Sequence, residues 1–391
     1  MHVFLRHGVA GLALLCAAVP KAHAAEPFNI DVVLPLTGAG AFLGSAEQKA
    51  LQQFEKSPAG TQGVAGRPVK FVFHDDQSSP QTAVQLATAI ASSKPAAMLG
   101  SALVGMCNAM APLMRRGPVM YCFSPGIYPA AGGYVFSSSN ATHDLMAAQL
   151  RYFRGRGWTK IAVITSTDAS GLDAAKQLRE IAGQPENKEV SIVGETTFNP
   201  SDVSAAAQIQ RLKAAEPQAV IAWSTGAAIG TVLKGILDAG LDVPVATTNG
   251  NMTYAQMRQY ADILPKQLYI PSSEWPQDKA LAGAPPEVAQ AKQQFFAAFD
   301  GADPPDSAAT FAWDPASLVV AALNKLGPTA TADQLRDYLA KLTGFAGVDG
   351  VYDFPKNPQR GLDDSSVVVT RWDPAAKAWR VVSQPRGLPL N

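Results

Sequence analysis

The sequence predicts an α/β protein that is built from two similar lobes. Short apolar, β-rich runs alternate with helical stretches over most of the 391 residues, which is typical of parallel sheets covered by helices. Many of these runs are apolar on both faces, as buried parallel strands are. The series of strands and helices also runs twice, once before about residue 141 and again from Lys160 to about residue 273.

Eight strands are expected in the two series, at residues 29–36, 68–73, 96–100, 118–123, 160–166, 219–224, 244–248 and 268–273. One helix between them should begin at Ser79 and Pro80, because serine is a good N-cap and proline fits the first turn. Further helices are expected to begin at Thr142, at Ser201 and near Gly226. The last of these should end at Ala239, with Gly240 as a left-handed C-cap.

The final part of the chain changes character. Helices are expected at 286–299, 311–326 and 332–341, followed by short strands at 351–354, 366–372 and 379–382. No Pro/Gly/Ser-rich linker separates the two series, so the lobes should be joined by short ordered crossovers that act as a hinge. We expect residues 25–141 with 274–345 to form the first lobe, and residues 142–273 with 346–391 to form the second.

The first 24 residues have the features of a secretory signal peptide. Arg6 precedes an apolar run at residues 8–19, and Ala22 and Ala24 place small residues where signal peptidase cleaves. A membrane anchor is the alternative, but a membrane span needs roughly 20 apolar residues, and this run ends before Pro20. We expect cleavage after Ala24 and release into the periplasm.

Composition limits the classes of function. Hydrophobic residues make up 47% and charged residues 16% of the chain, which is typical of a soluble globular protein. Cleavage would leave 367 residues with 30 basic and 32 acidic side chains, a net charge of −2. This length exceeds what one hydrophobic core usually supports. No basic field exists to attract nucleic acid, and we expect a monomer.

Two cysteines, Cys107 and Cys122, would remain in the mature chain. Exported proteins tend to pair their thiols, so a disulfide between these two residues is our hypothesis. No second long apolar segment occurs. The chain is therefore not expected to form a membrane pore itself, and it should act alone or with a membrane partner.

Motifs of common enzymes are missing. The glycine-rich turn at 38–44 lies between a predicted strand and a predicted helix, but its third glycine is one residue late for a dinucleotide fingerprint. No G-x-S-x-G elbow, P-loop, HExxH or CxxC occurs. His74, Asp75 and Asp76 could be imagined as a metal cluster, but capping and turn formation explain them better. We expect neither an enzyme nor a cofactor or metal site.

Polar and aromatic residues follow the predicted strands. In parallel sheets, ligands bind outside the carboxyl ends of the strands, where helix N-termini present unpaired N–H groups. Hydroxyls, amides and aromatic rings dominate these positions, and they suit a cleft for a small organic molecule. The candidates are Thr37, Phe42, Ser101, Val104, Ser124, Tyr128, Ser170, Ser224, Thr225, Asn249, Glu274 and Trp275.

Four segments, VVLPLTGAGAFLG, GRPVKFVFHDDQSSP, the Ser124-Pro125-Gly126 turn and GILDAGLDVPVATTNG, resemble the leucine/isoleucine/valine-binding protein family. The resemblance covers roughly residues 28–372, and HDDQSSP is its most specific part. It implies a type I periplasmic binding protein, with two Rossmann-like lobes joined by three crossovers. Such proteins close on a ligand and dock on an ABC permease in the inner membrane.

The resemblance also implies roles for several residues. Hydroxyls and backbone N–H groups of the first lobe hold the ligand carboxylate in this family, and residues 101–105 and 124–128, Gly126 included, occupy that place. Ser170 stands where the family usually has a tyrosine. Amino acid binders place an acid near Asn249 to hold the ammonium group, and an amide cannot supply that charge. Glu274 could contribute an acid from the neighbouring strand.

We therefore expect the periplasmic component of an ABC importer, with an amino acid or a small carboxylate as its ligand. Phe42, Tyr128 and Trp275 would suit a flat aromatic ligand. One alternative is a ligand sensor of the same fold that reports to a membrane receptor. A secreted α/β hydrolase or dehydrogenase is the third class considered, and nothing in the sequence supplies its nucleophile or cofactor loop.

Overall fold

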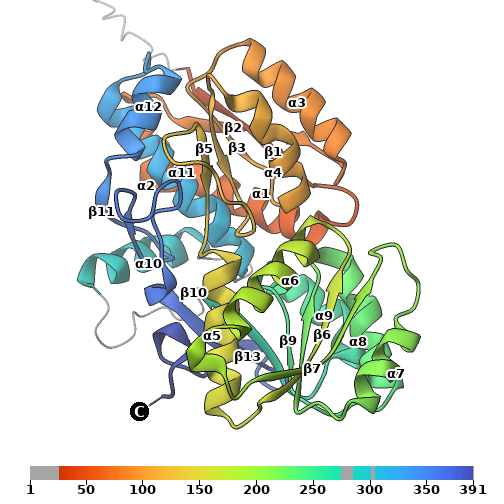
Figure 1. Ribbon diagram of the computed structural model, residues 1–391. Coiled ribbons are helices and arrows are strands. Elements are labelled where there is room, and N and C mark those ends of the chain that lie inside the picture. The colour runs from red at the N-terminus through yellow and green to blue at the C-terminus, as the bar shows by residue number, and fades with distance from the viewer. Residues whose placement is uncertain (1–25, 274–284, 301–303, 391) are drawn as a thin grey trace, which may run out of the picture.

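The computed structural model describes residues 26–273, 285–300 and 304–390. These residues form two α/β lobes, each around its own mainly parallel sheet, one above the other in Figure 1. The predicted α/β class with two mainly parallel sheets is confirmed. Within the described ranges, no helix has both the length and the apolar character that a membrane span requires.

The first sheet contains five parallel strands in the order β2-β1-β3-β4-β5. They are β1 (Phe28–Leu34), β2 (Val69–Asp75), β3 (Ala97–Gly100), β4 (Val119–Cys122) and β5 (Val135–Ser137). Side chains of neighbouring strand residues point to opposite faces, so Val32 packs in one core and Val33 in another. Both faces are covered by helices, which include α1 (Ala41–Lys56), α2 (Pro58–Gln62), α3 (Pro80–Ser92) and α4 (Val104–Met110).

The second sheet has the order β14-β13-β10-β9-β8-β6-β7. In it, β13 pairs antiparallel with both β10 and β14, and the other pairs are parallel. The strands are β6 (Lys160–Ser166), β7 (Ser191–Phe198), β8 (Ala219–Trp223), β9 (Val245–Ala246), β10 (Leu268–Ser273), β13 (Val367–Asp373) and β14 (Ala378–Val381). Its helices are α5 (Thr142–Gly155), α6 (Ala169–Ala182), α7 (Ala206–Ala214), α8 (Ile229–Asp238) and α9 (Tyr254–Gln259). Helices α5 and α6 cover one face, and α7 and α8 cover the other.

The C-terminal part adds α10 (Pro286–Ala298), α11 (Ser307–Leu326), α12 (Ala332–Leu339) and the antiparallel pair β11 (Thr343–Ala346) and β12 (Val351–Asp353). Helix α11 lies along α1 in the first lobe. Phe354, just after β12, packs edge-on against Phe136 of β5, with 5.6 Å between ring centroids. The lobe boundaries given above stay a prediction. The Phe354 contact leads us to propose that the last crossover comes after Phe354 and before β13, which begins at Val367.

Helix ends follow the local sequence where a capping side chain is present. The Ser79 hydroxyl accepts from the Thr82 N–H, and Pro80 is the first residue of α3, as predicted. Gly240 has a φ of +61° after α8, also as predicted. The predicted helix start at Ser201 is wrong, because the Asn199 side chain accepts from the Ser201 N–H and holds a turn. Helix α7 consequently begins at Ala206.

Candidate functional site

A cavity of about 230 Å³ lies between the lobes, where the carboxyl ends of both sets of parallel strands meet. Its first-lobe wall comes from the loops after β1, β2, β3 and β4, and its second-lobe wall from those after β6, β7, β8 and β9. Pockets for drug-sized ligands are typically about 300–1,000 Å³, so this cavity suits a smaller molecule. Residues that line it include Ala39, Val104, Gly105, Ser124, Gly126, Asp168, Ser170, Thr225, Thr248 and Gly250.

Several residues singled out from the sequence line this cavity together. Val104, Ser124 and Gly126 contribute to the first-lobe wall, and Ser170 and Thr225 contribute to the second. The hydroxyls of Ser170 and Thr225 are 3.0 Å apart, so one donates to the other. Gly126 packs tightly against Val104, because a Cβ on Gly126 would lie 2.7 Å from Val104 Cγ2. Only a glycine fits at that position in this arrangement.

Six other expected residues of the described part of the chain do not line the cavity: Thr37, Phe42, Ser101, Tyr128, Ser224 and Asn249. The Thr37 hydroxyl donates to Asp75 Oδ2 at 2.7 Å, and Ser224 is fully buried. Ser101 is fully buried and its hydroxyl donates to Asp76 Oδ2 at 2.5 Å, so this donor is already used within the protein. The Asn249 amide is buried too and donates to Ser139 Oγ at 3.3 Å, whereas its neighbours in sequence reach the cavity. Ser101 and Asn249 are therefore corrected from ligand contacts to supporting residues.

Two of the aromatic residues expected in the cleft, Phe42 and Tyr128, do not line it either. Phe42 faces outward from α1 and packs edge-on against Tyr260, with 6.3 Å between ring centroids. Tyr128 is 52% exposed, and its ring lies over the Arg360 guanidinium, 5.9 Å from ring centroid to Cζ. Glu274 and Trp275 lie outside the described residues. The described wall of the cavity contains two aromatic residues that were not among the sequence-predicted candidates, Trp223 and Phe311.

A larger groove of about 1180 Å³ lies on the outer side of the interlobe contact. Phe42, Tyr254 and Trp372 line it, together with the exposed basic residues Arg258 and Lys377. The smaller cavity is the candidate ligand site, because strand ends and helix N-termini converge there. The larger groove is lined instead by helix flanks and by the β13–β14 turn.

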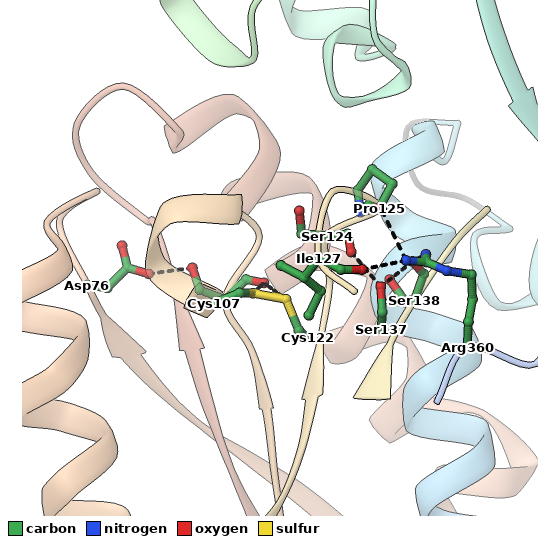
Figure 2. Close-up of a disulfide and its surroundings, with 10 residues drawn as sticks. Asp76, Cys107, Cys122, Ser124, Pro125, Ile127, Ser137, Ser138 and Arg360 are labelled. Atoms are coloured by element: carbon green, nitrogen blue, oxygen red, sulfur yellow. Dashed lines mark hydrogen bonds between the residues drawn. A yellow bond between two sulfur atoms is a disulfide. The ribbon is translucent and has the colours of Figure 1, made fainter. Parts of the chain in front are cut away.

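A disulfide connects two segments of the cavity wall (Figure 2). The structure joins Cys107 of α4 to Cys122 of β4, with 6.1 Å between their Cα atoms. Val104 and Gly105 begin the same helix, and Ser124 follows the same strand. The Ser101 carbonyl oxygen is also close, 3.1 Å from Cys107 Sγ. The loops after β3 and β4 are therefore held together covalently next to the site.

Sequence reasoning missed Arg360, whose guanidinium lies behind the loop after β4 (Figure 2). Its two terminal nitrogens donate to the carbonyl oxygens of Pro125, Ile127, Ser138 and Ser139. More than 220 residues separate Arg360 from these partners. No local pattern in the sequence marks such a contact.

Two acids near the cavity were also missed. Asp168 lines it and caps α6, because its Oδ1 accepts from the Gly171 N–H at 3.0 Å and from the Ser166 hydroxyl at 2.8 Å. Its position before a helical pattern is an N-cap signal that could have been recognised. Asp173 lies beside Gly126, and burial raises its pKa, while neighbouring hydroxyls partly offset this. Across the described residues, no group of three or more His, Cys, Asp or Glu side chains could hold a metal ion.

Comparisons with known proteins agree with this arrangement. A family model described as periplasmic binding protein matches residues 27–377. An extracellular ligand-binding receptor from Rhodopseudomonas palustris HaA2 superposes with a TM-score of 0.80 at 20% identity, over 91% of this chain and 99% of that chain. A search of curated proteins finds no match.

Two further solved structures were determined with a ligand bound. One is a solute-binding protein of an R. palustris ABC transporter in complex with benzoate, with a TM-score of 0.74, 20% identity and coverage of 93% and 97%. The other is the branched-chain amino acid transporter substrate-binding protein LivJ from Streptococcus pneumoniae with isoleucine, with a TM-score of 0.74, 19% identity and coverage of 91% and 99%. At these identities the structural likeness shows the fold.

Proposed function

This chain belongs to the periplasmic binding protein family, which is non-enzymatic, and we propose that it captures a small carboxylate for an ABC importer. The observation that supports this ligand is the cavity itself, which is small, lies between the lobes and is lined by hydroxyls and helix starts. A ligand that contacts both walls would hold the lobes closed. A closed, loaded binding protein is the form that a permease would recognise.

The lining of the cavity favours an anion over a cation. Val104, Gly105 and Met106 begin α4, so their N–H groups have no acceptor within the helix. These groups and the Ser124 hydroxyl can donate to a carboxylate, and a helix N-terminus favours negative charge. None of the described lining residues is lysine or arginine, so the carboxylate would be held by hydrogen bonds alone.

An amino acid is the second candidate, and Asp168 is the observation that favours it. Its carboxylate is the one acidic group among the described residues that line the cavity, and it could face a ligand ammonium group. Two donors already occupy Oδ1, so such a ligand would have to use the remaining oxygen. A carboxylate ligand would not need a contact with Asp168.

We propose further that residues 1–24 are a signal peptide and that the protein works in the periplasm as a monomer. The membrane partner would be an ABC permease. A role as a ligand sensor with a membrane receptor is the alternative, and the same cavity would serve it. Stimulation of a reconstituted permease and ATPase by the loaded protein would support transport.

Native mass spectrometry of protein purified without refolding tests the proposal directly. We expect a retained small carboxylate at one per chain. Adding it back should shrink the radius of gyration and raise the unfolding free energy by about 2.7 kcal/mol at 100 times Kd. A ligand that binds one to one and changes neither quantity would contradict a closing cleft.

A further inference from the structure

The guanidinium of Arg360 holds two parts of the chain in one place. Nη2 donates to the carbonyl oxygens of Pro125 at 3.1 Å and Ile127 at 2.7 Å, both in the loop after β4. Nη1 donates to the carbonyl oxygens of Ser138 at 3.2 Å and Ser139 at 2.9 Å, just after β5. The planar fork of arginine presents donors in fixed directions. One side chain therefore sets the orientation of four peptide groups.

These contacts also fix the direction of the N–H groups in the loop. The peptide groups after Pro125 and Ile127 are trans, and a trans peptide directs its C=O and N–H in opposite directions. With the Pro125 carbonyl turned toward Arg360, the Gly126 N–H must point away from it. Gly126 lines the cavity, so this N–H is directed to the cavity side of the loop.

The Gly126 N–H has no protein acceptor within the described ranges. The Pro125 carbonyl, in contrast, accepts from Thr142 N–H at 3.4 Å as well as from Arg360. An unused N–H group in a largely enclosed cavity is costly unless a ligand or water accepts from it. In this peptide the carbonyl oxygen has two donors and the N–H group has no acceptor. A ligand atom that accepts a hydrogen bond would therefore belong on the cavity side of the loop.

The charge of Arg360 acts in the same direction. Arginine stays protonated at neutral pH, and no carboxylate of the described residues lies within ion-pair distance of this one, which is 8% exposed. Charges buried without a partner are rare because they are expensive. Here the charge rests on four carbonyl oxygens directly behind the loop. It would stabilise an anion on the other side.

Two acids could oppose an anion in the cavity: Asp168, which lines it, and Asp173, which lies beside Gly126. A Cβ placed on Gly126 would be 3.0 Å from Asp173 Oδ2, so this carboxyl lies beside the loop. Burial raises the pKa of Asp173, whereas its side-chain hydrogen bonds and the positive charge of Arg360 lower it. The Arg360 charge is thus near enough to offset part of the repulsion. The Gln177 amide donates to the other oxygen of Asp173 at 3.1 Å.

We propose that Arg360 is a positioning residue that turns the Gly126 N–H into the cavity and so prepares the loop after β4 to receive a ligand carboxylate. The inference rests on the proposed function and adds how the site can select an anion without a basic residue in its wall. Arg360 would never touch the ligand. Its effect would pass through the peptide groups that it orients.

The experiment compares binding of benzoate and benzamide, which have nearly the same shape and differ in charge. In Arg360→Met we expect benzoate affinity to fall about 30-fold, the usual range for losing a charge-assisted hydrogen bond, with little change for benzamide. Arg360→Lys keeps the positive charge but lacks the planar guanidinium that donates to four carbonyl oxygens at once. This variant should therefore also lose most of the benzoate affinity. Calorimetry measures each constant.

Arg67 supplies a matched control. It also donates to two backbone carbonyls, those of Glu26 and Pro27, and lies over an aromatic ring, that of Phe28. It does not line the cavity. Arg67→Met should leave both ligands unaffected, and the unfolding midpoint of each variant should be recorded beside its affinity.

A second measurement uses the wild-type protein in case Arg360→Met fails to fold. Benzoate should shift the amide proton resonance of Gly126 downfield, as expected for a new charge-assisted hydrogen bond. Equal losses for benzoate and benzamide, full benzoate affinity in Arg360→Lys, or an unmoved Gly126 resonance would each overturn the proposal. Leucine is measured as a third ligand. If only leucine or benzamide binds and closes the cleft, the carboxylate inference fails while the binding function stands. If none of the three ligands binds, both fail.

Discussion

The Ala227 N–H of the second lobe donates to the Ala39 carbonyl oxygen of the first lobe across 3.1 Å. The neighbouring Gly226 has a φ of +84°, and a Cβ placed on it would be only 2.2 Å from that same oxygen. The lobes therefore meet backbone to backbone at the edge of the ligand cavity. Such a contact between the lobes is the arrangement expected of a closed cleft. Because Gly226 has no side chain, the Ala39 carbonyl oxygen can approach it this closely.

Gly226→Ala should keep the lobes from closing fully. The added methyl group cannot fit beside the Ala39 carbonyl, so ligand affinity should fall about tenfold, equivalent to about 1.4 kcal/mol. Small-angle scattering at saturating ligand should show a larger radius of gyration than for the wild type. Gly240→Ala is the control, because Gly240 also has a positive φ of +61° but no atom within 4 Å of its Cβ position. Equal affinities for the two variants would contradict the prediction.

The disulfide should support both stability and binding. Replacing Cys107 and Cys122 with serine removes a constraint on a 15-residue separation, which should lower the free energy of unfolding by about 3 kcal/mol. Ligand affinity should fall as well, because the loops after β3 and β4 are no longer tied. Urea unfolding and calorimetry measure the two effects.

Reductant gives the matched control for that prediction. It should reproduce the loss of stability in the wild type and have no effect on the double variant. Thiol titration of denatured, unreduced mature protein should find no free cysteine. Two reactive thiols would show that the bond does not form in the exported chain.

The sequence was sufficient for the buried strands and for helices with clear caps. β7 was missed because its residues are mostly exposed or half-buried, with polar residues near its end, so it lacks the apolar run of a central strand. β5 was missed because three residues give too little pattern. Both are strands at the edges of their sheets.

The sequence predicted which loops form the candidate site, but it did not predict which of their side chains line the cavity. Position after a strand places a residue near the cleft, but it does not give the direction of the side chain. Ser101 shows this, since its hydroxyl is used by Asp76, and so does Phe42, which the turn of α1 directs to the outer groove. Arg360 could not be found at all, because a contact over more than 220 residues depends on the fold.

A pair of buried acids should make stability depend on pH. Asp314 accepts from the N–H groups of Val348 and Asp349, both at 2.9 Å, and from the Tyr352 hydroxyl at 3.0 Å. Burial, with repulsion from Asp349, raises the pKa of Asp314 to about 7, and burial raises that of Asp349 to about 6. The folded protein therefore holds protons that the unfolded chain releases.

The sign follows from this difference. The folded-state pKa values lie above the unfolded value of about 3.9, so this contribution to stability is fully present below pH 4 and is lost as pH rises toward 7. Asp349→Asn should flatten the fall in unfolding free energy between pH 4 and 7, because an amide there does not ionise. The Ser273 hydroxyl can still donate to the new side-chain oxygen. Exposed Asp238, paired with Lys234, serves as control through Asp238→Asn. An unchanged slope in Asp349→Asn would contradict the assignment.

The last prediction concerns the choice between a carboxylate and an amino acid. Asn249 carries no charge and does not line the cavity, so it cannot be the charged partner of a ligand ammonium group. Burying an ammonium without a charged partner is costly, so benzoate and the keto acid of leucine should bind more tightly than leucine. Calorimetry with the three ligands on one preparation gives the order.

Asp168→Asn should leave benzoate binding intact or slightly improved, since the described cavity wall then carries no acid. If leucine binds most tightly and loses that affinity in Asp168→Asn, Asp168 holds the ammonium group. If leucine loses affinity only in Glu274→Gln, the acid is supplied from beyond the described residues. Either result would make the ligand an amino acid.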